Sequence, residues 1–266
     1  MGAGEQGKAT KYTVFLLELT CMQLKPTMRH AIQSNGTDVV VKLLRPGSNE
    51  LSILQHIDLI KSPYNHVIPL FGALKLNVGT FILLPEATPL DHVFALGMFR
   101  SKAMDFSRQL IEGVTFLHRH NIAHLDIKPQ NVLALRDQLF IIDFDISVLV
   151  DGPDALIDRW CGTPRWMAPE IGHQDGPKCW YSPIRADLWS CGLVLRYLAS
   201  KGNTKENPFE ALARQLLNKS PWLRPLLNME SSVVQARPLK DLNGRLERRL
   251  ELPHDAKRPA ISTIHT

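Results

Sequence analysis

The stretch His124-Leu125-Asp126-Ile127-Lys128-Pro129-Gln130-Asn131 places a carboxylate, an ammonium and a carboxamide within one short loop. It follows residues 101–120, where apolar side chains recur at helical spacing. Two short apolar segments come next, Val132 to Leu135 and Leu139 to Ile142, and Asp143 follows the second directly. This order predicts a long amphipathic helix, a loop rich in polar chemistry, and then two strands, the second of which presents a carboxylate.

These side chains suit phosphoryl transfer, which needs positioned phosphates, a neutralising metal ion and an acceptor hydroxyl in line. Asp126 can accept the hydroxyl proton, and Lys128 can stabilise charge on the transferring phosphoryl group. Asn131 and Asp143 offer the hard oxygen ligands that Mg²⁺ prefers. Taken one at a time, however, Asp and Asn residues in loops are as often turn formers or helix caps.

The first third of the chain is rich in predicted strands. Residues 28–33 and 38–44 flank Asn35-Gly36, a dipeptide typical of hairpin turns. Residues 49–60 carry apolar positions at helical spacing, and Phe81 to Leu84 is a short apolar strand. The remainder is mainly helical, with further patterns at 184–199, 208–218 and 241–251.

This distribution predicts an α+β protein with two unlike lobes, joined near Pro85 to Pro89, where we expect a ligand cleft. We expect the Gly-rich, polar residues 1–10 to be a disordered tip. One domain then covers residues 11–266, with an N-terminal lobe of about 11–86 and a C-terminal lobe of about 87–266.

Several motifs resemble those of eukaryotic protein kinases, in the same order along the chain. They are the H-x-D-x-K-P-x-N loop at 124–131, Asp143-Phe144-Asp145, Ala168-Pro169-Glu170, residues 187–192 (Asp-Leu-Trp-Ser-Cys-Gly) and Lys257-Arg258-Pro259. The resemblance extends from about Asp38 to the C-terminus. It implies a bilobal protein-kinase-like fold, with a small β-rich N-lobe and a larger, mainly α-helical C-lobe.

The same resemblance implies a nucleotide site for ATP. Lys42 resembles the strand lysine that grips the α- and β-phosphates, and Glu50 resembles the helix glutamate that orients it; the alternative for Glu50 is a surface helix charge. Leu84 stands at the gatekeeper position. The carbonyl of Pro85 and the amide of Ala87 would contact adenine, and proline retains the carbonyl that this contact needs.

The C-terminal motifs imply a Ser/Thr-specific enzyme and a set of supporting contacts. Lys128 and Thr163 resemble the Ser/Thr version of the catalytic and substrate loops, and we expect Thr163 to hydrogen-bond Asp126 and Lys128. Asp187 resembles the family's aspartate that fastens the backbone of the catalytic loop. The resemblance also predicts that Glu170 forms a buried pair with Arg258.

The chain departs from the family pattern at the nucleotide lid and at the metal-binding motif. No glycine occurs between Lys8 and Asn35, so the stretch Leu19 to Leu24 predicts a looser lid and weaker ATP binding. Asp145 replaces the family's Gly. It predicts backbone strain, an added metal ligand, or a bias of the loop into one state. These departures resemble those of divergent fungal kinases.

A third departure concerns regulation. Leu125 replaces the Arg that clasps an activation-loop phosphate in many kinases, and residues 148–162 contain no Ser, Thr or Tyr. A loop without a central phosphorylation site does not need a phosphate-binding Arg. We therefore expect activity that is independent of activation-loop phosphorylation.

Composition adds only general limits. The net charge of +5 is spread along the chain, and the four cysteines lack metal-ligand spacing. We expect a cytoplasmic or nuclear protein that binds a protein substrate, with no nucleic acid and no membrane association. The expected function is ATP- and Mg²⁺-dependent transfer to Ser/Thr hydroxyls. The alternatives are a pseudokinase that acts as a binding or scaffolding module and, with less support, a small-molecule kinase.

Overall fold

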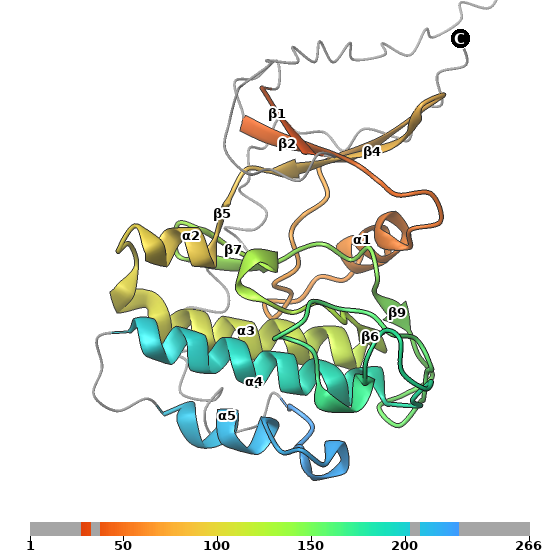
Figure 1. The fold of residues 1–266 in the computed structure, drawn as a ribbon. Helices are drawn as coiled ribbons and strands as arrows, with labels where there is room; N and C mark the ends of the chain where they lie inside the picture. Colours follow the sequence, from red (N-terminus) through yellow and green to blue (C-terminus); the bar gives the residue numbers. More distant parts are fainter. Residues whose placement is uncertain (1–27, 33–37, 203–207, 229–266) are drawn as a thin grey trace, which may run out of the picture.

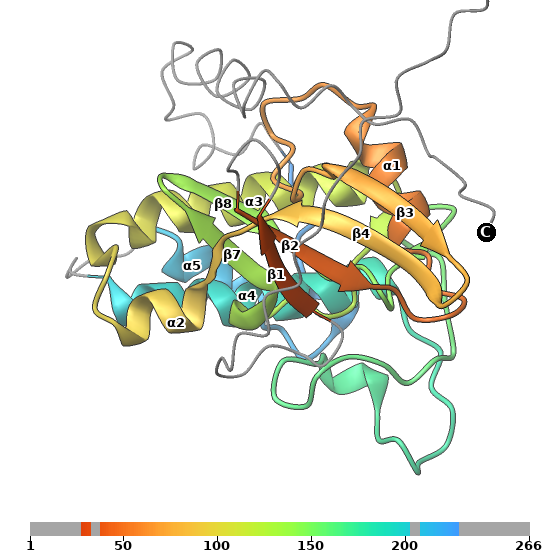
Figure 2. The same ribbon diagram turned by 90° about the horizontal axis from the view of Figure 1, so that it is seen from above.

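An antiparallel sheet of four strands forms one end of the protein in the computed structural model, which describes residues 28–32, 38–202 and 208–228. The sheet is seen edge-on in Figure 1, and its spatial order, β1-β2-β4-β3, can be followed in Figure 2. Its strands are β1 (Met28–Ile32), β2 (Asp38–Leu43), β3 (Gly72–Leu76) and β4 (Gly79–Pro85). Strands β1 and β2 pair as the predicted hairpin. Its Asn35-Gly36 turn lies outside the described residues.

The pairing of β2 with β4 places Lys42 in an apolar environment. Lys42 lies opposite Ile82, and Val40 lies opposite Leu84. Directly paired residues of an antiparallel sheet share a face, so Lys42, Ile82 and Leu84 all lie on one side. All three are buried. A lysine on a buried face needs counter-charges, and the next elements provide them.

Helix α1 (Glu50–Asp58) follows the sheet's second strand and packs through Ile53, Leu54 and Ile57. The chain then runs to β3 without regular structure, apart from a bridge between Val67 and Ile141.

The segment between α1 and β3 is fastened to the helical part of the molecule. His66 Nε2 lies 2.8 Å from Glu112 Oε2 on helix α3 (Ala103–Arg119). A Cβ on Gly113 would lie only 2.9 Å from His66 Cβ, so glycine permits this close approach.

The helical part is built around α3 and α4 (Pro183–Lys201), which run side by side in Figures 1 and 2. The described part of the chain also contains helices α2 (Leu90–Ala95) and α5 (Glu210–Leu216) and the 3₁₀ turns η1 (Arg100–Lys102) and η4 (Pro221–Leu223). Three predicted helices, at 101–120, 184–199 and 208–218, are thereby confirmed, with small differences at their ends. The predicted helix at 241–251 lies outside the described residues.

The described residues also form two small sheets. The first has the order β5-β7-β8, with β5 (Thr88–Pro89), β7 (Val132–Leu135) and β8 (Gln138–Ile141); the second pairs β6 (Ile122–Ala123) with β9 (Val148–Leu149). The predicted strands at 132–135 and 139–142 are therefore present, the second one residue earlier. The 3₁₀ turns η2 (Pro129–Asn131) and η3 (Pro169–Ile171) complete the fold.

The α+β expectation is confirmed: a β-rich N-terminal part packs on a mainly helical remainder. Among the described residues, no helix combines the length and the apolar character needed to cross a bilayer. Residues 1–10 and the predicted lid at 19–24 lie outside the described ranges.

Candidate active site

The backbone of the catalytic loop is held by hydrogen bonds to the carboxylate of Asp187 on α4. Its Oδ1 accepts a hydrogen bond from the Leu125 N–H at 2.7 Å, and its Oδ2 accepts one from the His124 N–H at 2.6 Å. Leu125 has a φ of 66°, a left-handed conformation that costs a non-glycine residue about 1–2 kcal/mol. The buried carboxylate offsets this strain by satisfying both amides. The prediction that Asp187 fastens this loop is confirmed.

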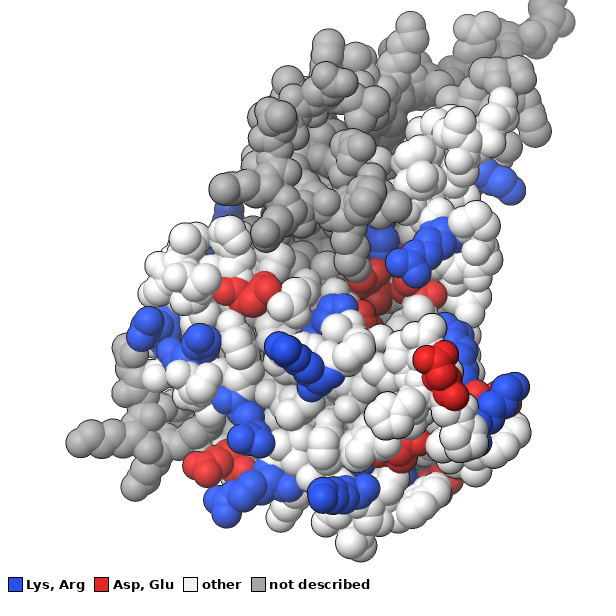
Figure 3. All heavy atoms as spheres, viewed as in Figure 1, with Lys and Arg blue, Asp and Glu red and all other residues white. Residues whose placement is uncertain are grey.

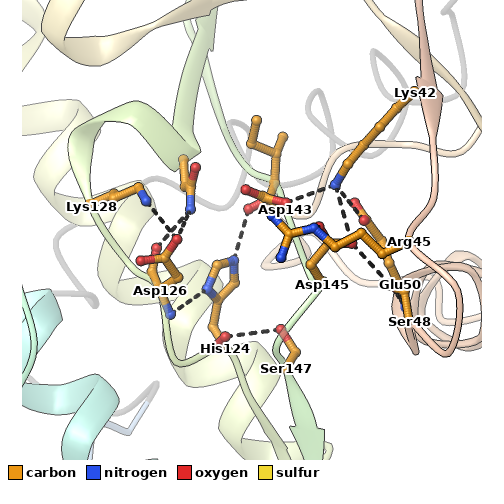
Figure 4. A network of polar contacts seen from close by, with 12 residues as sticks. Lys42, Arg45, Ser48, Glu50, His124, Asp126, Lys128, Asp143, Asp145 and Ser147 are labelled. Carbon is orange, nitrogen blue, oxygen red and sulfur yellow. Dashed lines mark hydrogen bonds and ion pairs between the residues drawn. The ribbon is translucent and has the colours of Figure 1, made fainter. Parts of the chain in front are cut away.

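His124 connects the catalytic loop to the segment that carries Asp143. Its Nε2 donates to the Ile142 carbonyl at 2.9 Å, and its Nδ1 accepts from the Asp126 N–H at 3.2 Å (Figure 4). Because one partner is an acceptor and the other a donor, these bonds fit a neutral imidazole protonated at Nε2. Ser147 Oγ donates to the His124 carbonyl at 3.0 Å.

Four side chains form what we call the catalytic-loop cluster: Asp126, Lys128, Asn131 and Thr163. Thr163 Oγ1 donates to Asp126 Oδ1 at 2.6 Å, and Lys128 Nζ donates to Asp126 Oδ2 at 2.6 Å and to Thr163 Oγ1 at 2.5 Å. Asn131 Nδ2 donates to Asp126 Oδ2 at 2.8 Å. The predicted contacts of Thr163 are confirmed, and residues 37 positions apart meet around one carboxylate.

A second group, the lysine cluster, consists of Lys42, Glu50, Asp143 and Asp145. Lys42 Nζ lies 2.5 Å from Glu50 Oε2 and 2.7 Å from Asp143 Oδ1 (Figure 4). Asp145 Oδ1 lies further away, at 3.7 Å. Glu50 is 1% exposed, which excludes the alternative of a surface helix charge.

Burial and charge pull the ionisation of this cluster in opposite directions. Burial lowers the pKa of Lys42, but the carboxylates of Glu50 and Asp143 outweigh it, so the pKa lies above its ordinary value. Burial raises the pKa of Glu50 to about 7, although the Lys42 ammonium opposes this rise. Lys42 is therefore held charged, whereas Glu50 titrates near neutrality.

The predicted Mg²⁺ ligands come from both clusters, Asn131 from the first and Asp143 from the second. Asn131 uses its Nδ2 to contact Asp126, so its amide oxygen is the atom that could serve as the predicted ligand. Asp143 has a φ of 72°, so the carboxylate stands on a strained backbone after β8, as at many functional sites. Carboxylate oxygens of Glu50, Asp143 and Asp145 lie within 4.8 Å of one another, around a single ammonium. Hard oxygen donors with surplus negative charge fit a divalent cation.

The junction between sheet and helices also exposes charge. Figure 3 shows acidic and basic atoms side by side at the level where the sheet meets the helical part.

The predicted adenine-contacting residues follow one another along the chain at this joint. Leu84 is buried, Pro85 ends β4, and Ala87 is partly buried against the core.

Asp145 is not a site of left-handed strain, which corrects one of the three expectations for this position. The positive φ of this motif belongs to Asp143, not to Asp145. Asp145 instead accepts a hydrogen bond from Ser48 Oγ at 3.0 Å, and its Oδ2 lies 3.4 Å from Arg45 Nε. Sequence patterns did not indicate Arg45 or Ser48, because neither belongs to a motif.

The prediction that Glu170 pairs with Arg258 was wrong. Arg224 Nη1 and Nη2 contact the two carboxylate oxygens of Glu170 at 2.5 and 2.8 Å, in a bidentate pair. Arg224 is buried and stacks 5.1 Å from the ring of Trp189. Arg258 lies outside the described residues. Both arginines precede a proline, so the Arg-Pro signal did not distinguish them.

Leu125 has an apolar role at the position where an Arg was missing. Its side chain is 5% exposed and belongs to a hydrophobic cluster with Ala123 and Cys161. Val148 and Val150, from the segment that follows Asp143, pack against the same cluster. Hydrophobic contacts therefore hold this segment on the catalytic loop.

Comparison with known proteins agrees with this geometry. The sequence model described as "Protein kinase domain" matches residues 25–235. The chain belongs to the protein kinase family. Similar curated proteins include CBL-interacting protein kinase 29 of Oryza sativa subsp. japonica (42% identity, 66% of this chain, 38% of the relative). Others are CBL-interacting serine/threonine-protein kinase 8 of Arabidopsis thaliana (31%, 63% and 37%) and Nik-related protein kinase of Mus musculus (34%, 52% and 10%).

This kinase chain spans less than two-fifths of the length of each of those three relatives. Two of the relatives are named as interacting with CBL, and one of these is also named a serine/threonine kinase. The site residues described above all lie within the matched range of 25–235.

Proposed function

We propose that this kinase domain transfers the terminal phosphoryl group of ATP to Ser/Thr hydroxyls of protein substrates, with Mg²⁺. The observation that supports this most strongly is the catalytic-loop cluster, in which one carboxylate is surrounded by donors from two loops. Such a carboxylate is fixed in position, as a general base must be. Asp126 and Lys128 are the proposed catalytic residues.

Each residue has a role that its contacts support. Asp126 orients the acceptor hydroxyl and accepts its proton, while Thr163 positions that carboxylate. Lys128 lies 2.6 Å from Asp126 and supplies positive charge next to the reacting hydroxyl. Bound Mg²⁺ would neutralise phosphate charge, held by Asn131 and Asp143.

The nucleotide is proposed to bind at the joint between sheet and helices. Lys42, held by Glu50 and Asp143, contacts the phosphates. The backbone carbonyl of Pro85 and the amide of Ala87 contact adenine beside Leu84. The predicted lid lies outside the described residues, so this proposal rests on the lysine cluster and the joint alone.

We also propose that activity does not require phosphorylation of the activation segment. Leu125 packs against residues of that segment where an Arg would bind a phosphate. Strand β9 of the segment pairs with β6, which precedes the catalytic loop. These contacts order the segment without an added charge.

The free thiols of Cys161, Cys179 and Cys191 are consistent with the proposed cytoplasmic or nuclear location.

One observation favours the pseudokinase alternative. The third carboxylate, Asp145, lies 3.7 Å from Lys42 and adds negative charge where phosphates would bind. A carboxylate here repels an anionic ligand unless a cation offsets its charge. The Arg45 guanidinium, 3.4 Å from Asp145 Oδ2, offsets only part of it because Arg45 is 68% exposed. A scaffold that holds nucleotide weakly would have this property.

The decisive experiment compares purified wild type with Asp126→Asn, using Mg-ATP and casein or histone as generic substrates. We expect turnover to fall roughly 10²- to 10⁴-fold, the usual contribution of general-base catalysis. Asp137→Asn is the matched control, because this carboxylate is 71% exposed and pairs only with Lys102 at the surface in the described structure.

Equal turnover of wild type and Asp126→Asn would contradict the enzyme proposal. Absence of both turnover and a thermal shift with Mg-ATP would support the pseudokinase. Phosphatase treatment should leave wild-type activity unchanged. Loss of activity, with a phosphate mapped to the segment after Asp143, would contradict independence from phosphorylation.

A further inference from the structure

Asp145 stands where the resemblance to kinases places a glycine, and its carboxylate is only 11% exposed. Both of its oxygens contact the segment between β2 and α1. Oδ1 accepts from Ser48 Oγ at 3.0 Å, and Oδ2 lies 3.4 Å from Arg45 Nε (Figure 4). Glycine has no side chain that could make these contacts.

Ser48 extends this contact to the first turn of α1. Its Oγ donates to Asp145 and also accepts a hydrogen bond from the Glu50 N–H at 3.1 Å. That N–H is one of the amides that a helix start leaves without an internal partner. Asn49, at the helix N-cap position, makes no side-chain cap. Ser48 supplies it, and Asp145 fixes the serine hydroxyl in the orientation that exposes its lone pair to the helix.

The position of Glu50 depends on this start of the helix. Glu50 is the first residue of α1, and only seven residues separate it from Lys42. If α1 began earlier, helical turns on both sides of Glu50 would fix its backbone. Instead, Glu50 is preceded directly by a loop. A contact that fixes the loop at Ser48 therefore also fixes the carboxylate that holds Lys42.

We propose that Asp145 is a positioning residue that ties the metal-binding motif to the start of α1 through Ser48 and so keeps Glu50 against Lys42. The inference rests on the proposed function for its effect on turnover, but not for its effect on α1. The aspartate that replaces the family's glycine at position 145 thus has a structural role in this chain. Under this proposal α1 is ordered by a contact within the chain, just as the activation segment is held by apolar packing within the chain.

The test measures amide hydrogen exchange in the whole chain, without nucleotide, for wild type, Asp145→Gly, Asp145→Asn and Ser48→Ala. In Asp145→Gly we expect exchange in residues 50–58 to accelerate about tenfold or more, because a hydrogen bond to a charged group is lost. Asp145→Asn keeps an acceptor for Ser48 and should show a smaller increase. Exchange in α4 should not change.

Ser52→Ala is the matched control. Its hydroxyl also lies in the first turn of α1, but it donates to the Asn49 carbonyl and does not contact Asp145. Under the proposal it leaves exchange in α1 near the wild-type value. In turnover assays, Asp145→Gly should lower kcat more than it raises KM for ATP, since Lys42 is misplaced rather than lost.

Unchanged exchange in α1 of Asp145→Gly overturns the proposal. So does a rise in the Mg²⁺ concentration needed for a thermal shift with no change in α1, because Asp145 would then act as a metal ligand. If wild type lacks turnover while Asp145→Gly still loosens α1, the proposed function fails and the positioning role stands. If wild type turns over while Asp145→Gly leaves α1 unaffected, the proposed function stands and the positioning role fails.

Discussion

The catalytic-loop cluster and the lysine cluster lie next to each other but are built differently. In the first, one carboxylate faces one ammonium, and a hydroxyl and an amide complete the hydrogen bonds. In the second, three carboxylates surround one ammonium. The first cluster is balanced within the protein. The second sets three carboxylates against Lys42 and the largely exposed Arg45, so it keeps a smaller surplus of negative charge.

This difference indicates where each cluster obtains its stability. The backbone of the catalytic loop is held by Asp187 and by apolar packing of Leu125, so its geometry does not depend on a ligand. The lysine cluster would gain from a bound cation, because added positive charge relieves the repulsion between its carboxylates. A bound cation would therefore add to the contacts that hold the lysine cluster, whereas the catalytic loop has no comparable charge to be relieved.

The largest effect should follow from removing the support of the catalytic loop with Asp187→Ala. The N–H groups of His124 and Leu125 would be left buried without partners, at about 1–3 kcal/mol each. We expect unfolding free energy to fall by roughly 2–6 kcal/mol, with loss of turnover, measured by urea denaturation and by the substrate assay. Asp187→Asn, which keeps one acceptor, should lose about half as much.

Asp175→Ala is the surface control for this change, because that residue is exposed. A stable Asp187→Ala protein with normal turnover would show that the loop does not depend on this carboxylate.

The next largest effect concerns the bidentate pair of Glu170 and Arg224. Arg224→Met should lower the unfolding free energy by about 3–5 kcal/mol, because it leaves the Glu170 carboxylate without its buried partner. Arg196→Met is the control, since Arg196 lies exposed on α4. Denaturation curves of the two variants that coincide would contradict a structural role for the pair.

The smallest effect tests the surplus charge of the lysine cluster through pH. The folded protein raises the pKa of Glu50 from 4.5 to about 7, so it binds this proton more tightly than the unfolded chain does. Stability contributed by the group is therefore present at low pH and falls as pH rises from about 4.5 to about 7. Between pH 5 and pH 7 we expect wild type to lose roughly 2 kcal/mol relative to Glu50→Gln.

Urea denaturation of both proteins at pH 5, 6 and 7 measures this difference. Glu210→Gln, with a carboxylate that is 63% exposed, should run parallel to wild type. If Glu50→Gln also runs parallel, Glu50 does not titrate in this range.

Much of the fold could be predicted because local patterns were strong. The helices around 101–120 and 184–199 and the strand at 132–135 follow from apolar spacing, and the structure differs from them only near the ends. The kinase motifs predicted which side chains meet, including Thr163 with Asp126. They failed for Glu170: Arg224 and Arg258 stand in the same Arg-Pro context, and the structure shows Arg224 in the pair, stacked on Trp189.

The role of Asp145 was likewise open in the sequence, which allowed strain, metal binding or a bias of the loop. The structure shows that Asp143 carries the positive φ and that Asp145 contacts Ser48 and Arg45. No spacing rule relates positions 48 and 145, because their contact depends on how β2, α1 and β8 pack.

The sequence by itself determined which residues at 124–131 and 143 are proposed to carry the chemistry, because phosphoryl transfer requires particular side chains in a fixed local order. Only the tertiary structure decided how each is held: Asp187 under the loop, Arg224 on Glu170, and Ser48 between Asp145 and α1. The physical reason is that hydrogen bonds and ion pairs depend on distances of a few ångströms between segments far apart in the chain. Those distances are set by the packing of the whole core.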